Sequence, residues 1–228
     1  MTRLSKKALQ TIIGTTPDGI IGPMSKQALH RDLSNLTAPA LTEADYVAAA
    51  DRLGVPVNHI KGVRKVEAPR GPYTDDGIPS LLYERHKFRN NTSPPGKFND
   101  SHPALSGAPY GKGGYGTFSQ QFNKFASACA LDPEAAFRAC SWGAFQVLGE
   151  NATWMGYDSA YDMVKSLTVS EAAHLETFVR YVEKKGLVKA LQQCRPGDAN
   201  SCIPFVRGYN GTGFRAYNYH IKLAQAIK

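Results

Sequence analysis

One glutamate stands where an apolar helical segment gives way to a loop. Glu67 ends a stretch in which Ile60, Val63 and Val66 share one side, and Pro69 stops the helix directly after it. A carboxylate near the C-terminus of a helix feels the negative end of the helix dipole, which disfavours ionisation. Burial against Val63 and Val66 would raise the pKa further. A carboxyl group that stays protonated near neutral pH can act as a general acid, as glycosidic bond cleavage requires.

The same glutamate has a plainer interpretation as a structural or solvated side chain. Lys65 and Arg70 would lower the pKa of Glu67 if they pointed inward. Two further acids follow along the chain, Asp76 and Glu84, and either could supply a second carboxyl group. The residues alone leave both questions open.

Three other segments combine amides, acids and aromatic side chains. Residues 82–86 (Leu-Tyr-Glu-Arg-His) carry Glu84, residues 141–147 (Ser-Trp-Gly-Ala-Phe-Gln-Val) set a glutamine among small and large apolar residues, and residues 207–211 read Arg-Gly-Tyr-Asn-Gly. Aromatic rings suit the apolar faces of sugars, and amides suit acetamido and hydroxyl groups. For Trp142, packing in the core is an equal alternative.

In this order, Val66-Glu67 and the motifs at 82–86, 141–146 and 207–211 resemble the N-acetylmuramidase family of bacteriophage endolysins, which is lysozyme-like. The resemblance covers residues 42–228. It implies that Glu67 is the catalytic general acid and that Glu84 is a second carboxyl group, with Asp76 as its rival. It also implies a groove lined by Tyr83, Trp142, Gln146, Tyr209 and Asn210.

The spacing of Asp76 from Glu67 is similar to that of the second acid in classical phage lysozymes. Those enzymes also use a threonine six residues further on, and here that position is Leu82. The choice between Asp76 and Glu84 therefore stays open.

The reaction that this resemblance implies is hydrolysis of the β-1,4 bond between N-acetylmuramic acid and N-acetylglucosamine in peptidoglycan, which causes host cell lysis. Two carboxyl groups and water suffice for it, so we expect no metal and no organic cofactor. A lytic transglycosylase acting on the same bond and a non-catalytic wall-binding protein remain alternatives.

The charge balance favours an anionic polymer as partner. The 228 residues include 27 Lys and Arg against 19 Asp and Glu, which gives a net charge of +8 and a pI near 9.3. Residues 61–97 hold eight basic and four acidic residues, so we expect a basic surface there. Peptidoglycan fits as the partner, and because no nucleic-acid-binding signature is present we expect no nucleic acid.

The sequence also bears on location and assembly. The sequence contains no run of 18 apolar residues, so it predicts no transmembrane helix. Residues 1–10 also lack the apolar region of a signal peptide. We therefore expect the protein to stay in the host cytoplasm before lysis, and we also expect it to be a monomer. It would reach the wall in the periplasm only with a membrane-permeabilising partner such as a holin.

The first 38 residues form a segment of their own, with helical spacing on both sides of a turn at 16–19. Leu9-Gln10, the Asp-Gly-Ile-Ile-Gly-Pro run at 18–23 and Ala28-Leu29 resemble the peptidoglycan-binding repeat of cell-wall enzymes. A generic helical hairpin is the alternative. Residues 34–41 have linker composition, so we predict that residues 1–39 can be deleted without unfolding the rest.

The remaining elements predict an α+β fold that is mostly helical, with one small β-hairpin region inside a lysozyme-like catalytic domain. Thr42 can cap a helix that Gly54 ends, and Pro56 opens the helix that leads to Glu67. Later helices are expected at 118–130, 133–140 and 168–185, the last with a capping box of Thr168 and Glu171. A short strand or hairpin is expected at 79–84 and long loops at 90–116.

Four cysteines fall in no metal-binding or redox spacing. Cys194 and Cys202 flank a turn-rich loop that could bring them together as a disulfide. The alternative is four reduced, buried thiols.

Overall fold

The computed structural model describes residues 3–68, 71–110 and 115–228. The described chain is mostly helical, with one small sheet, as the sequence predicts. Its α-helices are α1 (Lys6–Ile12), α2 (Pro23–Leu33), α3 (Glu43–Leu53), α4 (Val57–Glu67), α5 (Arg85–Asn91), α6 (Gln121–Cys129), α7 (Pro133–Arg138), α8 (Ala160–Leu167), α9 (Glu171–Lys184), α10 (Val188–Gln192), α11 (Ile203–Asn210) and α12 (Tyr219–Ala226). The 3-10 helices are η1 (Phe118–Gln120), η2 (Gly143–Phe145), η3 (Gly149–Asn151) and η4 (Thr212–Arg215).

The sheet joins segments that are far apart in the chain. Strand β1 (Leu81–Tyr83) pairs antiparallel with β2 (Cys140–Trp142), and β2 pairs antiparallel with β3 (Val147–Leu148). The strand expected within 79–84 is present, and its partner is the segment that carries the Ser-Trp-Gly motif. The sheet thereby brings two of the motifs side by side.

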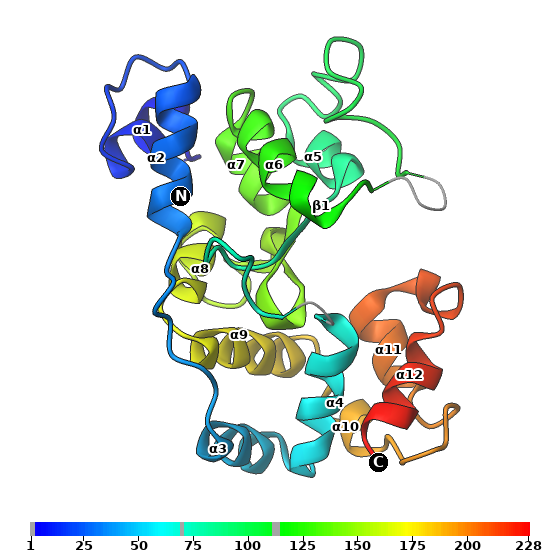
Figure 1. Cartoon of the computed structure of the whole chain (residues 1–228). Helices are drawn as coiled ribbons and strands as arrows, with labels where there is room; N and C mark the ends of the chain where they lie inside the picture. Colours follow the sequence, from blue (N-terminus) through cyan, green and yellow to red (C-terminus); the bar gives the residue numbers. More distant parts are fainter. Residues whose placement is uncertain (1–2, 69–70, 111–114) are drawn as a thin grey trace.

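Two groups of helices lie on either side of this sheet (Figure 1). One group contains α3, α4 and α9–α12, and within it α4 packs against both α3 and α12. The other contains α1, α2 and α5–α7. Buried side chains from both groups belong to a single hydrophobic cluster. None of the helices in the described ranges is both long enough and apolar enough to cross a bilayer.

Helix boundaries near Glu67 follow the predicted signals. Thr42 and Asp45 form a reciprocal capping box at the start of α3, and Gly54 ends that helix in the left-handed conformation with φ 62°. Pro56 precedes α4, and Glu67 is its last residue. The sequence therefore places Glu67 at the helix end correctly.

The predicted capping box of Thr168 and Glu171 is wrong. Ser170 caps α9, because its side chain accepts a hydrogen bond from the N–H of Ala173. Thr168 instead follows the last residue of α8, and its hydroxyl donates to the carbonyl of Lys165. Because α9 begins at Glu171, its N-cap position falls on Ser170 and not on Thr168.

The first 38 residues pack firmly against the rest of the protein. Leu9, Leu29 and Leu33 are fully buried in the common hydrophobic cluster. On α2, Asp32 accepts hydrogen bonds from the Tyr161 hydroxyl at 2.9 Å and from Lys165 Nζ at 2.7 Å. The boundaries 1–38 and 42–228 remain predictions, and this packing speaks against a first segment that can be removed freely.

Residues 34–41 are held in place despite their linker composition. The Asn35 N–H donates to the carbonyl of Gly77 at 3.0 Å, and the Asn35 side chain donates to the carbonyl of Thr168 at 2.8 Å. Further along, the N–H of Glu171 donates to the carbonyl of Pro39 at 2.9 Å. The connecting segment is therefore an ordered strap.

All four cysteines, Cys129, Cys140, Cys194 and Cys202, are buried free thiols. Of the two alternatives that the sequence leaves open, the structure has the reduced one.

Candidate active site

A hollow of about 260 Å³ lies at the C-terminal end of α4. Figure 1 shows that end of α4 pointing towards the sheet, between the two groups of helices. The walls come from the end of α4, the start of β1, the entrance to α6 and the turn after β2. The lining residues are Glu67, Ala68, Gly71, Ser80, Leu81, Leu82, Gly116, Phe118, Gln121 and Gln146.

Glu67 is the acid that lines this hollow. Burial raises the pKa of Glu67 to about 7, although the hydrogen bond from Asn210 and the charge of Lys222 both act to lower it. Asn210 Nδ2 donates to Glu67 Oε1 at 2.8 Å. A carboxyl group with this pKa is substantially protonated near neutral pH, which is the state that a general acid needs.

Asn210 should set the alkaline side of the pH profile. The amide N–H stabilises the ionised form of Glu67, so Asn210→Ala should raise the pKa of Glu67 further. Activity that depends on protonated Glu67 should then persist to higher pH than in the wild type. The profile of kcat/KM against pH measures this, and an alkaline limb that stays in place or moves down would contradict it.

Gln146 reaches the same hollow from the turn after β2. The residue has a positive φ of 48°, and its side-chain amide donates to the carbonyl of Gly143 at 2.9 Å. His174 on α9 supports this turn, since its Nδ1 accepts from the N–H of Ala144 at 2.9 Å while Nε2 donates to the carbonyl of Leu167 at 2.8 Å. This pattern requires neutral imidazole, and burial agrees by lowering the pKa of His174 to about 4.

Gly143 leaves no room for a side chain beside His174. A Cβ at this position would lie 2.5 Å from His174 Nδ1, and φ is +72°. We expect Gly143→Ala to lower the free energy of unfolding by about 2–4 kcal/mol, the sum of left-handed strain and overpacking. Activity should fall with it, because the turn that carries Gln146 must move.

Gly156→Ala is the matched control for this prediction. Gly156 also has a positive φ, +94°, but a Cβ there meets nothing within 4 Å. Urea denaturation of the three proteins separates strain from collision. Equal destabilisation by both substitutions would show that contact with His174 adds nothing.

Glu84 lies two residues after Leu82, a wall residue of the hollow. It directly follows β1, in which Leu82 lines the hollow and pairs with Ser141. Ser141 Oγ lies 3.3 Å from Glu84 Oε1. Burial raises the pKa of Glu84, a shift that Lys87 and Ser141 oppose and Glu150 reinforces. Glu84 is therefore a second part-buried carboxyl group, 19% exposed, although it is not itself a lining residue.

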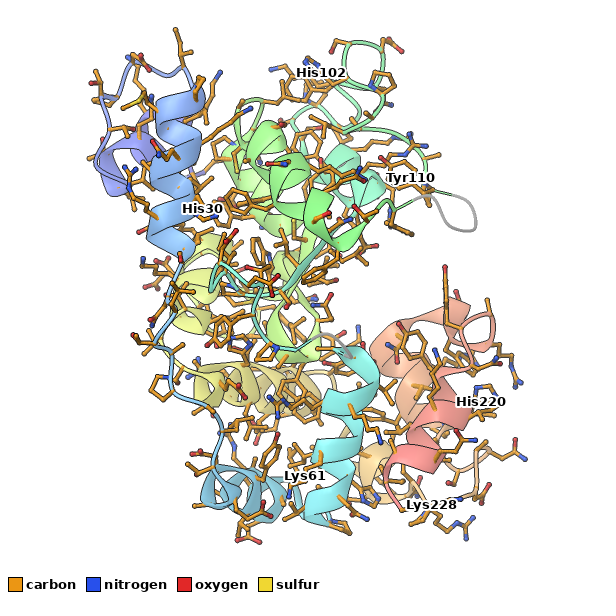
Figure 2. The ribbon with its side chains drawn as sticks, in the orientation of Figure 1. His30, Lys61, His102, Tyr110, His220 and Lys228 are labelled. Carbon is orange, nitrogen blue, oxygen red and sulfur yellow. The ribbon has the colours of Figure 1, made fainter. Side chains whose placement is uncertain are left out.

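Asp76 lies at the contact with the first segment. Its carboxylate is 70% exposed and lies 3.2 Å from Nε2 of His30, which Figure 2 labels on α2. Its carbonyl accepts a hydrogen bond from the hydroxyl of Ser34. The structure does not place Asp76 among the residues that line the hollow.

Tyr83 and Trp142 lie in the core and not on the groove surface that the family resemblance implies. Tyr83 has no exposed surface, and its hydroxyl donates to the carbonyl of Leu105 at 2.7 Å. Trp142 is 1% exposed, and its indole N–H donates to the carbonyl of Phe137 at 3.1 Å. Alternate residues of a strand face opposite sides of a sheet, and these two rings occupy the core side.

Tyr209 supports the site from behind. Its hydroxyl donates to the carbonyl of Phe145 at 2.6 Å, and its ring stacks on Phe205 with the centroids 5.4 Å apart. Burial, assisted by the charge of Glu67, raises the pKa of Tyr209 well above its ordinary value. The phenol thus ties α11, which carries Asn210, to the turn that carries Gln146.

Two residues of the site carry no motif in the sequence. Gln121 accepts the N–H of Tyr83 at 3.0 Å and lines the hollow. Tyr219 lies within electrostatic range of both Glu67 and Glu84, and burial, together with these two charges, raises its pKa to about 12. Gln121 is an isolated glutamine and Tyr219 is one of eleven tyrosines, so neither belongs to a sequence motif that would predict its place near Glu67.

Within the described ranges, no group of three or more His, Cys, Asp or Glu side chains is placed to bind a metal ion.

Comparison with known proteins identifies the fold that holds this site. A family model described as N-acetylmuramidase matches residues 56–228. The crystal structure of the Burkholderia AP3 phage endolysin is similar over 97% of this chain and 83% of that chain, with 32% identity and a TM-score of 0.71. No curated protein matches the chain in sequence. The chain therefore belongs to the N-acetylmuramidase family, a family of glycoside hydrolases that act on peptidoglycan.

Proposed function

We propose that the protein is a phage endolysin that hydrolyses the β-1,4 bond between N-acetylmuramic acid and N-acetylglucosamine. The observation that carries this proposal is Glu67, a carboxyl group with a pKa of about 7 on the wall of a hollow. Family membership and the likeness to the AP3 phage endolysin support the same reaction. Glu67 would protonate the oxygen of the leaving sugar.

The other site residues have distinct proposed roles. Glu84 would supply the second carboxylate, because it is part-buried and is bonded by Ser141, the strand partner of Leu82 in the hollow. Gln146 would contact acetamido or hydroxyl groups of the glycan with its amide, since it lines the hollow. Asn210 would hold the Glu67 carboxyl group in position.

Mass spectrometry of digested cell wall tests this reaction against its nearest rival. A muramidase adds water and leaves a reducing N-acetylmuramic acid end, whereas a lytic transglycosylase leaves the 1,6-anhydro form, which is lighter by one water. We expect reducing ends, because Glu84 offers a carboxyl group that the intramolecular route does not need. Mainly anhydro products would favour the transglycosylase, and undigested wall would favour a binding protein.

The biological setting follows as a further part of the proposal. An endolysin causes host cell lysis from the inside, so the protein would accumulate in the host cytoplasm. It would act there as a monomer. A membrane-permeabilising partner such as a holin would give it access to the wall. Residues 1–38, with their Leu9-Gln10 and Asp18-Gly19 motifs, would contact the wall as a binding module.

A further inference from the structure

A second hollow, of about 210 Å³, lies between α11 and η4. Ile203 and Phe214 provide its apolar surface, and Arg207, Thr212 and Arg215 provide its polar rim. Both arginines are exposed, and Phe214 is 4% exposed. The guanidinium carbon of Arg215 lies 5.2 Å from the centre of the Phe214 ring.

Neither of the two arginines is paired with an acidic residue in the described part of the chain. In the ranges that the structure describes, neither guanidinium forms an ion pair or donates a hydrogen bond to another residue. This contrasts with residues 61–97, where Lys61 is paired with Glu43 and Lys87 with Glu150. The basic surface expected in that segment is thus partly neutralised by these pairs.

The C-terminal segment from Lys184 to Lys228 holds most of the net charge. It contains eight basic residues and one acid, Asp198, which amounts to +7 of the +8 of the whole chain. Figure 2 shows side chains of this segment projecting outward from α10–α12, with His220 and Lys228 labelled. The segment attracts anions, and the hollow gives that attraction a shaped site.

The hollow is connected to the catalytic site through one face of α11. Ile203, Arg207 and Asn210 are four and three residues apart, so they lie along the same side of the helix. Asn210 bonds the carboxyl group of Glu67, and Arg207 lies about 4.5 Å before it along the helix axis. Arg207 therefore lies within one helical turn of the residue that bonds Glu67, on the same side of α11.

We propose that this hollow binds a carboxylate of the peptide that hangs from N-acetylmuramic acid in peptidoglycan. The inference rests on the proposed function, because that reaction places a peptide-bearing sugar at Glu67. Two guanidinium groups suit a carboxylate, and the Ile203 and Phe214 surface suits the aliphatic part of an amino-acid side chain. Two or three extended residues span about 7–10 Å, which exceeds the rise along α11 from Asn210 to Arg207.

Two soluble substrates test this site directly. One consists of glycan strands that keep their uncross-linked peptides, and the other of the same strands after an N-acetylmuramoyl-L-alanine amidase has removed the peptides. Release of reducing ends gives kcat/KM for each. We expect the wild type to prefer the peptide-bearing strands by about tenfold, the scale of two exposed charge-assisted contacts. Arg207→Gln combined with Arg215→Gln should bring the ratio close to one.

The control variant removes an equal number of positive charges from the same C-terminal segment, at positions outside the hollow. Lys185 and Lys189 are exposed and do not line the hollow. Lys185→Gln combined with Lys189→Gln should therefore keep the tenfold ratio. A wild type without preference, or an equal loss of the ratio in both double variants, would overturn the peptide site. Failure to cleave either substrate would instead overturn the proposed function beneath it.

Discussion

Glu67→Gln should lower kcat/KM on peptidoglycan by about 10²–10⁴-fold, the usual contribution of a positioned general acid. Glutamine keeps the size of the side chain and can still bond Asn210, but it cannot give a proton to the leaving oxygen. The pKa of about 7 implies that wild-type activity itself falls as the pH rises through that value. Release of reducing ends across the pH range measures both effects.

Stability provides the control for this variant. The pKa of Glu67 rises from 4.5 to about 7 on folding, so ionisation of Glu67 costs the folded state stability as the pH rises through this window. Glu67→Gln should therefore match the wild type in urea denaturation at pH 4 and exceed it at pH 8. Near-wild-type activity would refute the assignment, and unfolding of the variant at both pH values would refute the physical account.

Glu84→Gln should be the second most damaging substitution, with a loss of about 100-fold or more, while Asp76→Asn should stay within about twofold. Glu84 is part-buried, its pKa is raised by burial, and Ser141 beside the hollow donates to it. Asp76 is exposed and paired with His30 on α2. Rates for the two variants on the same wall preparation decide between them.

The opposite order of effects would transfer the second acid to Asp76. A Glu84→Gln variant that keeps wild-type activity would leave Glu67 as the sole acid and favour the transglycosylase reaction. Glu84→Asp is a useful further variant, because it keeps the charge and moves it by about 1.5 Å, a displacement that a catalytic carboxylate rarely tolerates.

The helix ends and the acid at one of them could be predicted from local sequence. Capping residues, prolines and glycine act within a few residues, so Thr42, Gly54 and Pro56 fix α3 and α4 in sequence and in structure alike. The family resemblance adds Gln146 and Asn210, both of which the fold brings to Glu67 or its hollow. Local signals and motif order together give this part of the site.

The orientation of the aromatic residues could not be predicted in the same way. Tyr83 and Trp142 belong to three-residue strands, which are too short for an alternating pattern to reveal which face is buried. Their direction depends on β1 pairing with β2, a contact between segments almost sixty residues apart. Gln121 and Tyr219 enter the site through similar long-range packing, so no motif announces them.

Attachment of the first segment to the rest of the protein fixes the distance between residues 1–38 and Glu67. A flexible tether would let a wall anchor and a cutting site sample many separations, with a local concentration set by chain length. Here the backbone hydrogen bonds of Asn35 and Pro39 hold the strap against the body of the protein. A glycan held by residues 1–38 would thus be presented to Glu67 at one fixed offset. The position of cleavage would then be set by this fixed distance. To cleave another glycosidic bond, the whole protein would have to dissociate from the wall and bind again.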